Sequence, residues 1–225
     1  MSDGGGTPAY LDEVYAERFS DAEAAAKDAL WREVVRYLGR FIPADSAVLD
    51  LACDRGYFIR HVVARERWAT DVRDMSADMS PGIRFVQADG LALLDHLPRE
   101  HFDVVFMSNY LEHLATGEAV TAQLSVAHGL LRPGGRVVIL QPNIRLTGGA
   151  YWDFIDHKVA LTERSLAEAA EIAGLTIERV IVRFLPYTTK GRRPVPPWVV
   201  RAYLAFPPAW RFLGQQTLFI AQRPA

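Results

Sequence analysis

The stretch Val48-Leu49-Asp50-Leu51-Ala52-Cys53-Asp54-Arg55-Gly56-Tyr57-Phe58 predicts a buried strand that runs through a tight turn into a helix. An acid at the end of the strand and small residues in the turn are typical of a βα unit that binds a nucleotide-like ligand. Two of the three glycines expected in such a turn are missing. The rest of the chain therefore has to show what this unit belongs to.

Further acidic and polar residues follow the next apolar segments. Asp71 ends a second segment, Asp89 follows residues 85–88, and residues 102–109 end in Ser-Asn. A Leu-Arg-Pro-Gly-Gly turn and an apolar run complete the series over residues 131–140. With these motifs in this order, residues 45–142 resemble the class I S-adenosylmethionine (SAM) dependent methyltransferases.

Apolar strand-like segments alternate with helical patterns over most of the chain. Helices are expected at residues 21–39, 118–131 and 162–173, and residues 142–160 read as a loop. Strands are expected at residues 47–51, 68–71, 84–87, 104–107, 137–140, 176–184 and 217–222. This pattern predicts an α/β fold, a Rossmann-like, doubly wound, mostly parallel seven-stranded sheet with helices on both faces. Ligands of such sheets bind beyond the carboxyl ends of the strands.

The chain is expected to form one methyltransferase domain over residues 1–225. Residues 1–44 would be an N-terminal helical segment, residues 45–142 the cofactor-binding core, and residues 143–225 the substrate side. This last part includes the apolar insertion 185–216. Four interpretations of the insertion stay open: it packs against the domain, covers the substrate as a lid, forms a homodimer contact, or touches a lipid-linked substrate.

Composition excludes several classes of function. The 225 residues carry a net charge of −2 without blocks of like charge, so no nucleic-acid partner is expected. One cysteine excludes an internal disulfide, and the six histidines show no metal-ligand spacing, so no metal site is predicted. The N-terminus lacks the features of a signal peptide, and no segment is apolar enough to span a bilayer. A cytoplasmic protein without stable membrane insertion is expected.

The resemblance assigns the glycine-poor turn to the cofactor. Asp50, Ala52, Cys53 and Gly56 are expected at the cofactor site, with Cys53 a small packed residue rather than a nucleophile. Asp54 replaces a glycine that usually supplies an unusual backbone angle. Asp tolerates such angles and also caps helices, and the helix cap is the preferred interpretation over direct cofactor contact.

The remaining cofactor residues follow from the later strands. An acid about twenty residues beyond the first strand accepts from ribose hydroxyls in dinucleotide-like folds, which places Asp71 and its neighbour Val72 there. The resemblance assigns the adenine amino group to Asp89 and Gly90, and the methionine end to Ser108 and Asn109. Arg18 pairs with the cofactor carboxylate or is a surface arginine; both interpretations stay open.

The chemistry depends on the acceptor, since a sugar hydroxyl needs a base and a neutral amine hardly does. His113, just beyond a cofactor-lining strand, and His157, in an aromatic loop, are the catalytic candidates. The tail resembles bacterial methyltransferases that accompany saccharide or secondary-metabolite pathways, which favours a small-molecule hydroxyl acceptor. An inactive scaffold protein and a SAM-binding enzyme of a non-methylating reaction remain as alternatives. An NAD enzyme fits only the strand–turn–helix unit at residues 48–58 and the acid that ends the second strand.

Overall fold

A seven-stranded sheet forms the centre of the protein, described here by a computed structural model for residues 21–187 and 195–225. Its strands are β1 (Ala47–Leu51), β2 (Glu66–Asp71), β3 (Ile83–Gln87), β4 (Phe102–Ser108), β5 (Leu131–Pro142), β6 (Thr176–Leu185) and β7 (Gln216–Gln222). Their order is β3-β2-β1-β4-β5-β7-β6, and only β7 runs antiparallel to its two neighbours. The reversal of strand order between β1 and β4 creates the place where such sheets bind ligands.

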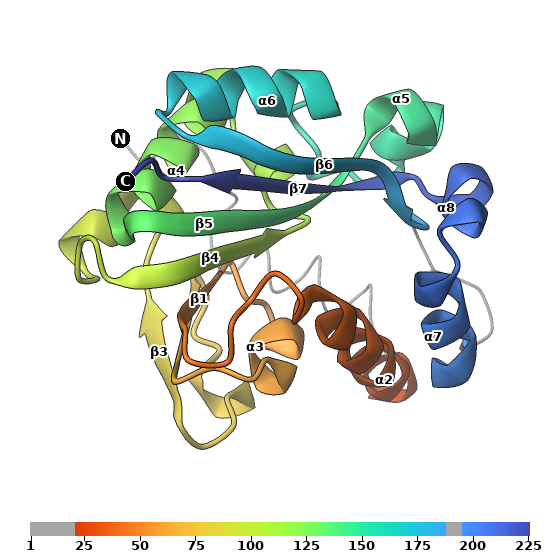
Figure 1. Cartoon of the computed structure of the whole chain (residues 1–225), viewed down its shortest axis with the longest axis horizontal. Coiled ribbons are helices and arrows are strands. Elements are labelled where there is room, and N and C mark those ends of the chain that lie inside the picture. Colours follow the sequence, from red (N-terminus) through yellow and green to blue (C-terminus); the bar gives the residue numbers. More distant parts are fainter. Residues whose placement is uncertain (1–20, 188–194) are drawn as a thin grey trace.

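Helices cover both faces of this sheet. The α-helices are α2 (Asp21–Leu38), α3 (Tyr57–His61), α4 (Gly117–Leu130), α5 (Ile144–Thr147), α6 (Glu163–Ile172), α7 (Pro197–Ala205) and α8 (Pro207–Leu213). The described residues also form the 3-10 turns η1 (Ser76–Asp78), η2 (Gly90–Asp95), η3 (Leu111–His113) and η4 (Gly148–Asp153). Helices α2 and α3 lie on one face of the sheet and α6 lies on the other (Figure 1). The predicted fold class is therefore confirmed.

The alternation of side chains along each strand divides the interior into two cores. In β4, Val105 and Met107 pack with α4 and α6, whereas Val104 and Phe106 face α2 and α3. All four side chains are buried, as expected for a central strand with both faces covered. Phe58 of α3 stacks on the Phe106 ring with centroids 3.7 Å apart, which fixes α3 against the sheet.

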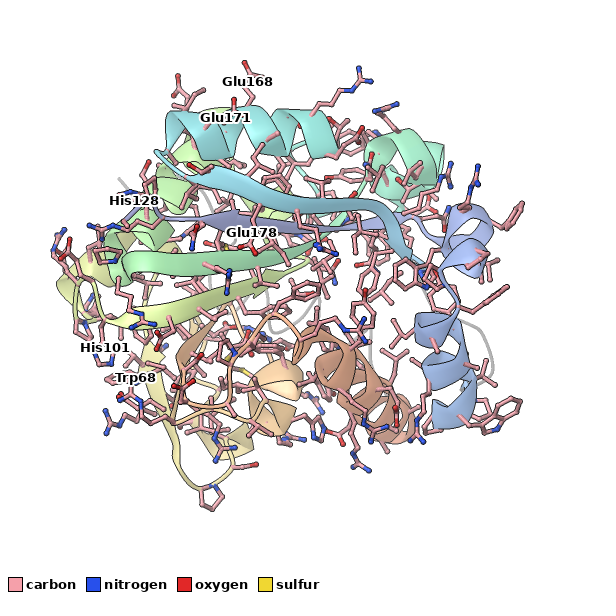
Figure 2. The ribbon with its side chains drawn as sticks, viewed as in Figure 1. Trp68, His101, His128, Glu168, Glu171 and Glu178 are labelled. Carbon is pink, nitrogen blue, oxygen red and sulfur yellow. The ribbon has the colours of Figure 1, made fainter. Side chains whose placement is uncertain are left out.

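Helix α6 illustrates how the sequence sets a helix and its buried face. Its N-cap residue Thr162 accepts hydrogen bonds from the backbone of Arg164 and Ser165, and Gly174 follows the helix with φ of 80°. Leu166 faces the core. Glu168 and Glu171 point away from the sheet (Figure 2). The predicted start and stop of this helix are confirmed.

The connections depart from the prediction in three places. Only the 3-10 turns η1 and η2 connect β2 to β3 and β3 to β4, where the alternating pattern predicts helices. Helix α4 passes directly into β5, so the Pro-Gly-Gly sequence at 133–135 lies inside the strand rather than ending the helix. The expected loop at 142–160 contains α5 and η4.

Helices α7 and α8 lie within the apolar insertion. Their buried residues Val200, Leu204 and Trp210 join the core beside α2, which confirms that the insertion packs against the domain. The opposite face exposes large apolar side chains, with Trp198 70% and Phe212 83% exposed. Among the helices of residues 21–187 and 195–225, none has the length and apolar character needed to cross a membrane.

Candidate active site

The carboxyl ends of four neighbouring strands bring the predicted cofactor residues together. Asp50 lies in β1, Asp71 ends β2, and Asp89 follows β3. Ser108 ends β4, and Asn109 follows it with a backbone hydrogen bond of 2.9 Å to the Leu140 carbonyl of β5. Because these strands are parallel, all of these groups lie along one edge of the sheet.

The turn after β1 adopts left-handed backbone conformations at three positions, although it contains one glycine. Ala52, Asp54 and Gly56 have φ values of 56°, 48° and 69°. The φ of Gly56 favours glycine, and a Cβ atom there would lie 2.9 Å from the end of the Met79 side chain. The turn therefore has the tight form predicted for a ligand-binding βα unit.

The interpretation of Asp54 as a helix cap is wrong. Gly56 is the N-cap of α3, and no side chain caps that helix, because the left-handed turn places its start two residues later than expected. The Asp54 carboxylate instead forms ion pairs with Arg73 at 3.0 Å and with Lys27 of α2 at 3.4 Å. Asp54 thus connects the turn to α2 and to the segment after β2.

Asp50 presents an incompletely paired buried carboxylate. Its side chain is 3% exposed, and within the described residues Oδ2 has no hydrogen-bond partner. Burial raises the pKa of Asp50 well above its ordinary value, the neighbouring Asp71 and Asp54 charges add to this, and the Ile59 backbone amide opposes it. A buried acceptor oxygen at the ligand-binding edge fits a ligand that donates a hydrogen bond or carries positive charge.

Asp71 is already hydrogen bonded within the protein. Its Oδ2 accepts from the Asp54 backbone N–H at 3.0 Å, and its Oδ1 accepts from the Arg73 backbone at 3.0 Å and from Arg73 Nε at 3.2 Å. A carboxylate offers about four acceptor positions. Three of these positions are occupied, so one is left for a ribose hydroxyl while Arg73 keeps its place.

The third strand end forms a polar wall. Asp89 is exposed, and its Oδ1 accepts from the Leu91 backbone N–H at 2.9 Å. Gly90 lies so close to Tyr110 Oη and Gln123 Oε1 that a Cβ atom would clash with both. Tyr110 donates a hydrogen bond of 2.8 Å to Gln123, which in turn donates to the Gly90 carbonyl. These contacts fix Gly90 closely against Tyr110 and Gln123.

The remaining predicted cofactor residues are less closely organised. Cys53 is buried beside the acidic residues, and burial raises the pKa of its thiol, so it is a packed residue as predicted. Val72 is half-buried, and its carbonyl accepts from Gln87 Nε2 at 3.1 Å. Asn109 has φ of 48° and donates to Ser108 Oγ at 3.2 Å. Arg18 lies outside the described residues.

The two catalytic candidates meet beside this edge. Their imidazole centroids lie 4.9 Å apart, although His113 belongs to η3 and His157 to the segment after η4. His113 Nδ1 lies 3.1 Å from the Asp156 carbonyl and 3.3 Å from its Oδ2. The Nε2 atoms of both histidines lie 3.9 Å from Oε1 of the buried Glu112. The structure thus joins two distant segments into one polar cluster.

Backbone and ring contacts hold this cluster in place. The Glu112 carbonyl accepts from the backbone N–H groups of Lys158 and Val159 at 2.8 and 3.1 Å. Gln141 Nε2 donates to Glu112 Oε2 at 3.0 Å, and burial raises the pKa of Glu112. Phe154 stacks on the His157 ring with centroids 5.2 Å apart. The segment after η4 is therefore fixed against η3.

Sequence reasoning missed several partners in these clusters. Arg73 and Lys27 pair with the acids at the cofactor edge, and Gln141 orients Glu112. Arg73 had a signal, because a basic residue two positions after a predicted ribose acid lies on the same strand end. Lys27 and Gln141 had none, because each meets its partner only through the tertiary fold.

Methyltransferases are found among the known proteins that are similar to this chain. A family model described as a methyltransferase domain matches residues 22–180. A SAM-dependent methyltransferase from Archaeoglobus fulgidus is 23% identical with a TM-score of 0.59, over 85% of this chain and 94% of that one. None of the curated proteins matches this chain significantly in sequence.

Two further solved structures are similar at lower identity. One is a chain from the complex between the Haloferax volcanii Trm112 methyltransferase activator and the putative methyltransferase, at 16% identity and a TM-score of 0.69 over the whole of both chains. The other is geranyl diphosphate C-methyltransferase from Streptomyces coelicolor A3(2), at 16% identity and a TM-score of 0.58 over 84% of this chain and 78% of that one. At such identities the likeness establishes the fold.

Proposed function

Since this chain belongs to the methyltransferase-domain family and is a SAM-dependent methyltransferase of class I, we propose that it methylates a hydroxyl oxygen of a small-molecule acceptor. Transfer from the sulfonium is an in-line displacement in which the acceptor oxygen bonds the methyl carbon while the carbon–sulfur bond breaks. Alignment of the two reactants in a dry pocket contributes roughly 7–11 kcal/mol to such a step.

The His113–Asp156 pair is the observation that carries the choice of acceptor. Its contact at Nδ1 favours the tautomer in which Nδ1 carries the proton and Nε2 is the basic nitrogen. A hydroxyl group must lose its proton to attack, and a positioned base accelerates this by roughly 10²–10⁴-fold. A neutral amine would need no such base, so the pair supports an oxygen acceptor. His157 packs edge-on behind His113 and positions it.

The acidic edge of the sheet is the proposed SAM site. Asp71 accepts a hydrogen bond from a ribose hydroxyl, and Asp89 accepts one from the adenine amino group. The Oδ2 atom of Asp50 accepts a hydrogen bond from the ammonium group of the cofactor. Ala52, Cys53 and Gly56 supply the turn that lets the cofactor approach the backbone. Val72, Gly90, Ser108 and Asn109 complete the wall, and Arg18 stays a predicted partner of the cofactor carboxylate.

Release of S-adenosylhomocysteine together with the mass of the product tests the reaction. Pairs of acceptors that differ only in a hydroxyl or an amine, built on sugars and phenols, are offered to the wild type and to His113→Asn, Asp156→Asn and His101→Asn. Oxygen methylation by the wild type is expected, with kcat about 10²–10⁴-fold lower in His113→Asn. The His101 variant is the control, because its imidazole pairs with Glu66 at a distant edge (Figure 2).

SAM affinity and turnover together show whether His113 acts on the acceptor and whether the protein transfers methyl groups at all. Calorimetry should give the same dissociation constant for the wild type and for His113→Asn, since the base contacts the acceptor. Methylation of amines alone, or full turnover by His113→Asn, would overturn the oxygen proposal. SAM binding without any S-adenosylhomocysteine release across the acceptor panel would favour a scaffold protein or a non-methylating enzyme.

A further inference from the structure

The polar cluster beside the cofactor edge has the composition of a metal site. One carboxylate oxygen of Glu112 and one imidazole nitrogen each from His113 and His157 lie within 4.8 Å of one another. Imidazole nitrogen and carboxylate oxygen are the donors that Zn²⁺ and other first-row divalent ions bind in proteins. Three such donors from two distant segments meet at one point, where the sequence spacing alone predicts no metal.

Glu112 supplies the second observation. Its side chain is 1% exposed, and within the described residues Oε1 accepts no hydrogen bond. This oxygen faces the Nε2 atoms of both histidines at 3.9 Å, beyond hydrogen-bond distance. A buried carboxylate oxygen directed at two imidazoles without bonding either of them is explained by an ion between the three.

The surrounding groups orient the three donors as outer partners do in metal sites. Asp156 contacts Nδ1 of His113, and Gln141 donates to the second oxygen of Glu112. These contacts leave His113 Nε2 and Glu112 Oε1 as the ligand atoms. Donors on a tetrahedral zinc ion are roughly 3.4 Å apart, so small side-chain rotations would bring the three onto one ion.

We propose that Glu112, His113 and His157 bind a divalent transition-metal ion, with Zn²⁺ as the reference ion, and that this ion binds the acceptor hydroxyl. The proposal rests on the proposed function for the identity of the acceptor. His113, the most exposed of the three at 20%, marks the side from which the acceptor oxygen reaches the ion. Three protein ligands leave at least one coordination position open for it.

The ion changes how the acceptor proton is lost. Bound to the cation, the hydroxyl gives its proton to water, and the resulting alkoxide forms the new oxygen–methyl bond. The carbon–sulfur bond breaks with its electron pair going to sulfur, which yields S-adenosylhomocysteine. In the metal-bound protein, His113 is thus a ligand, whereas in the metal-free protein its imidazole is the base.

Titration of chelator-treated protein with Co²⁺, followed by visible absorption and by displacement with Zn²⁺, tests the site. The variants are Glu112→Gln and His157→Asn, and the matched control is His101→Asn, which removes the histidine of another His–Glu pair. One ion per chain is expected in the wild type and the control. Loss of an outer partner weakens metal sites about 10–100-fold, so loss of a ligand should weaken binding by more than about 100-fold.

A measurement on the wild type alone guards against variants that fail to fold. X-ray absorption of the zinc-loaded protein should show nitrogen and oxygen neighbours with two imidazoles and without sulfur. Sulfur ligation, or equal Co²⁺ binding by the wild type and the two ligand variants, would overturn the metal site. Chelator-resistant oxygen methylation that needs His113 but survives Glu112→Gln would reject the metal and keep the proposed function. Stoichiometric metal binding without methylation of any hydroxyl would keep the metal site and reject the proposed function.

Discussion

The guanidinium of Arg73 lies against the carboxylate of Asp71, with Nε 3.2 Å from Oδ1. Both side chains are 7% exposed, and Arg73 also reaches Asp54 with Nη2 3.0 Å from Oδ1. The acid expected to bind the ribose is therefore part of a buried ion-pair network. Arg73 offsets the repulsion between the Asp54 and Asp71 carboxylates at the end of the first two strands.

Removal of Arg73 should be strongly destabilising. Arg73→Met keeps the length of the side chain and leaves the buried carboxylates without the guanidinium, which costs roughly 3–5 kcal/mol in comparable pairs. Arg84→Met is the matched control, because Arg84 is 64% exposed and lies 3.7 Å from Glu66. Its loss should cost at most about 1 kcal/mol. Urea denaturation at pH 7 measures both, and equal losses would contradict the network.

Asp50→Asn should move stability and cofactor binding in opposite directions. Burial raises the folded-state pKa of Asp50, so its ionisation costs stability once the pH exceeds the unfolded value of about 3.9. The variant removes this cost and should raise Tm by about 2–4 °C per kcal/mol gained at pH 7, but not near pH 3. Its SAM dissociation constant should rise about tenfold or more, since a charged hydrogen bond is lost.

Thr70→Val is the control for this opposition. Thr70 lies on the neighbouring strand, and its buried Oγ1 has no hydrogen-bond partner among the described residues. Valine has nearly the same shape, so the variant should be as stable as the wild type or slightly more stable. Its SAM affinity should be unchanged. A Tm for Asp50→Asn below that of the wild type at pH 7 would show that the Asp50 charge is compensated in the folded protein.

Sequence patterns located the sheet and the strand ends that carry the predicted cofactor residues, because both depend on local signals. The apolar run before Asp50 and the acids at Asp71 and Asp89 mark strand ends, and the structure places them along one edge. Backbone strain was also readable, since Asp54 replaces a glycine and adopts a positive φ. These features need only a few adjacent residues.

Contacts between distant segments could not be read in the same way. Asp54 meets Lys27 and Arg73 rather than capping a helix, and Glu112 meets His157, because the fold brings separate segments together. The turns η1 and η2 also stand where the alternating pattern predicts helices.

The pairing of Arg201 with Glu33 should fasten α7 to α2 in a pH-dependent way. Arg201 donates from Nε and Nη2 to the two Glu33 oxygens at 3.0 and 2.8 Å. The hydrogen bond from Arg201 is the main cause that lowers the pKa of Glu33, opposed by burial and aided by Arg36. A depressed folded pKa contributes stability above the unfolded value of about 4.3, and this contribution is lost as pH falls through the folded pKa.

Glu33→Gln should therefore cost about 1.5–3 kcal/mol at pH 7 and much less near pH 3. Glu168→Gln on the exposed side of α6 is the control, and it should change stability by less than about 0.5 kcal/mol at either pH (Figure 2). Chemical denaturation at pH 7 and pH 3 gives the change in unfolding free energy of each of the two variants relative to the wild type. A loss in Glu33→Gln that persists unchanged at pH 3 would point to packing rather than charge.

Trp198 and Trp210 offer a matched test of the two faces of the apolar insertion. Trp210 is 7% exposed, donates from Nε1 to the Tyr203 carbonyl at 2.8 Å, and packs edge-on against Tyr37 of α2 and Phe184 of β6. Trp210→Ala should cost about 3–5 kcal/mol, because it leaves a cavity in the core. Trp198 is 70% exposed, so Trp198→Ala should change stability by less than about 0.5 kcal/mol in the isolated chain. Denaturation midpoints over a range of protein concentrations decide the matter: a Trp198→Ala loss that grows with concentration would mean that its face is covered by a second copy.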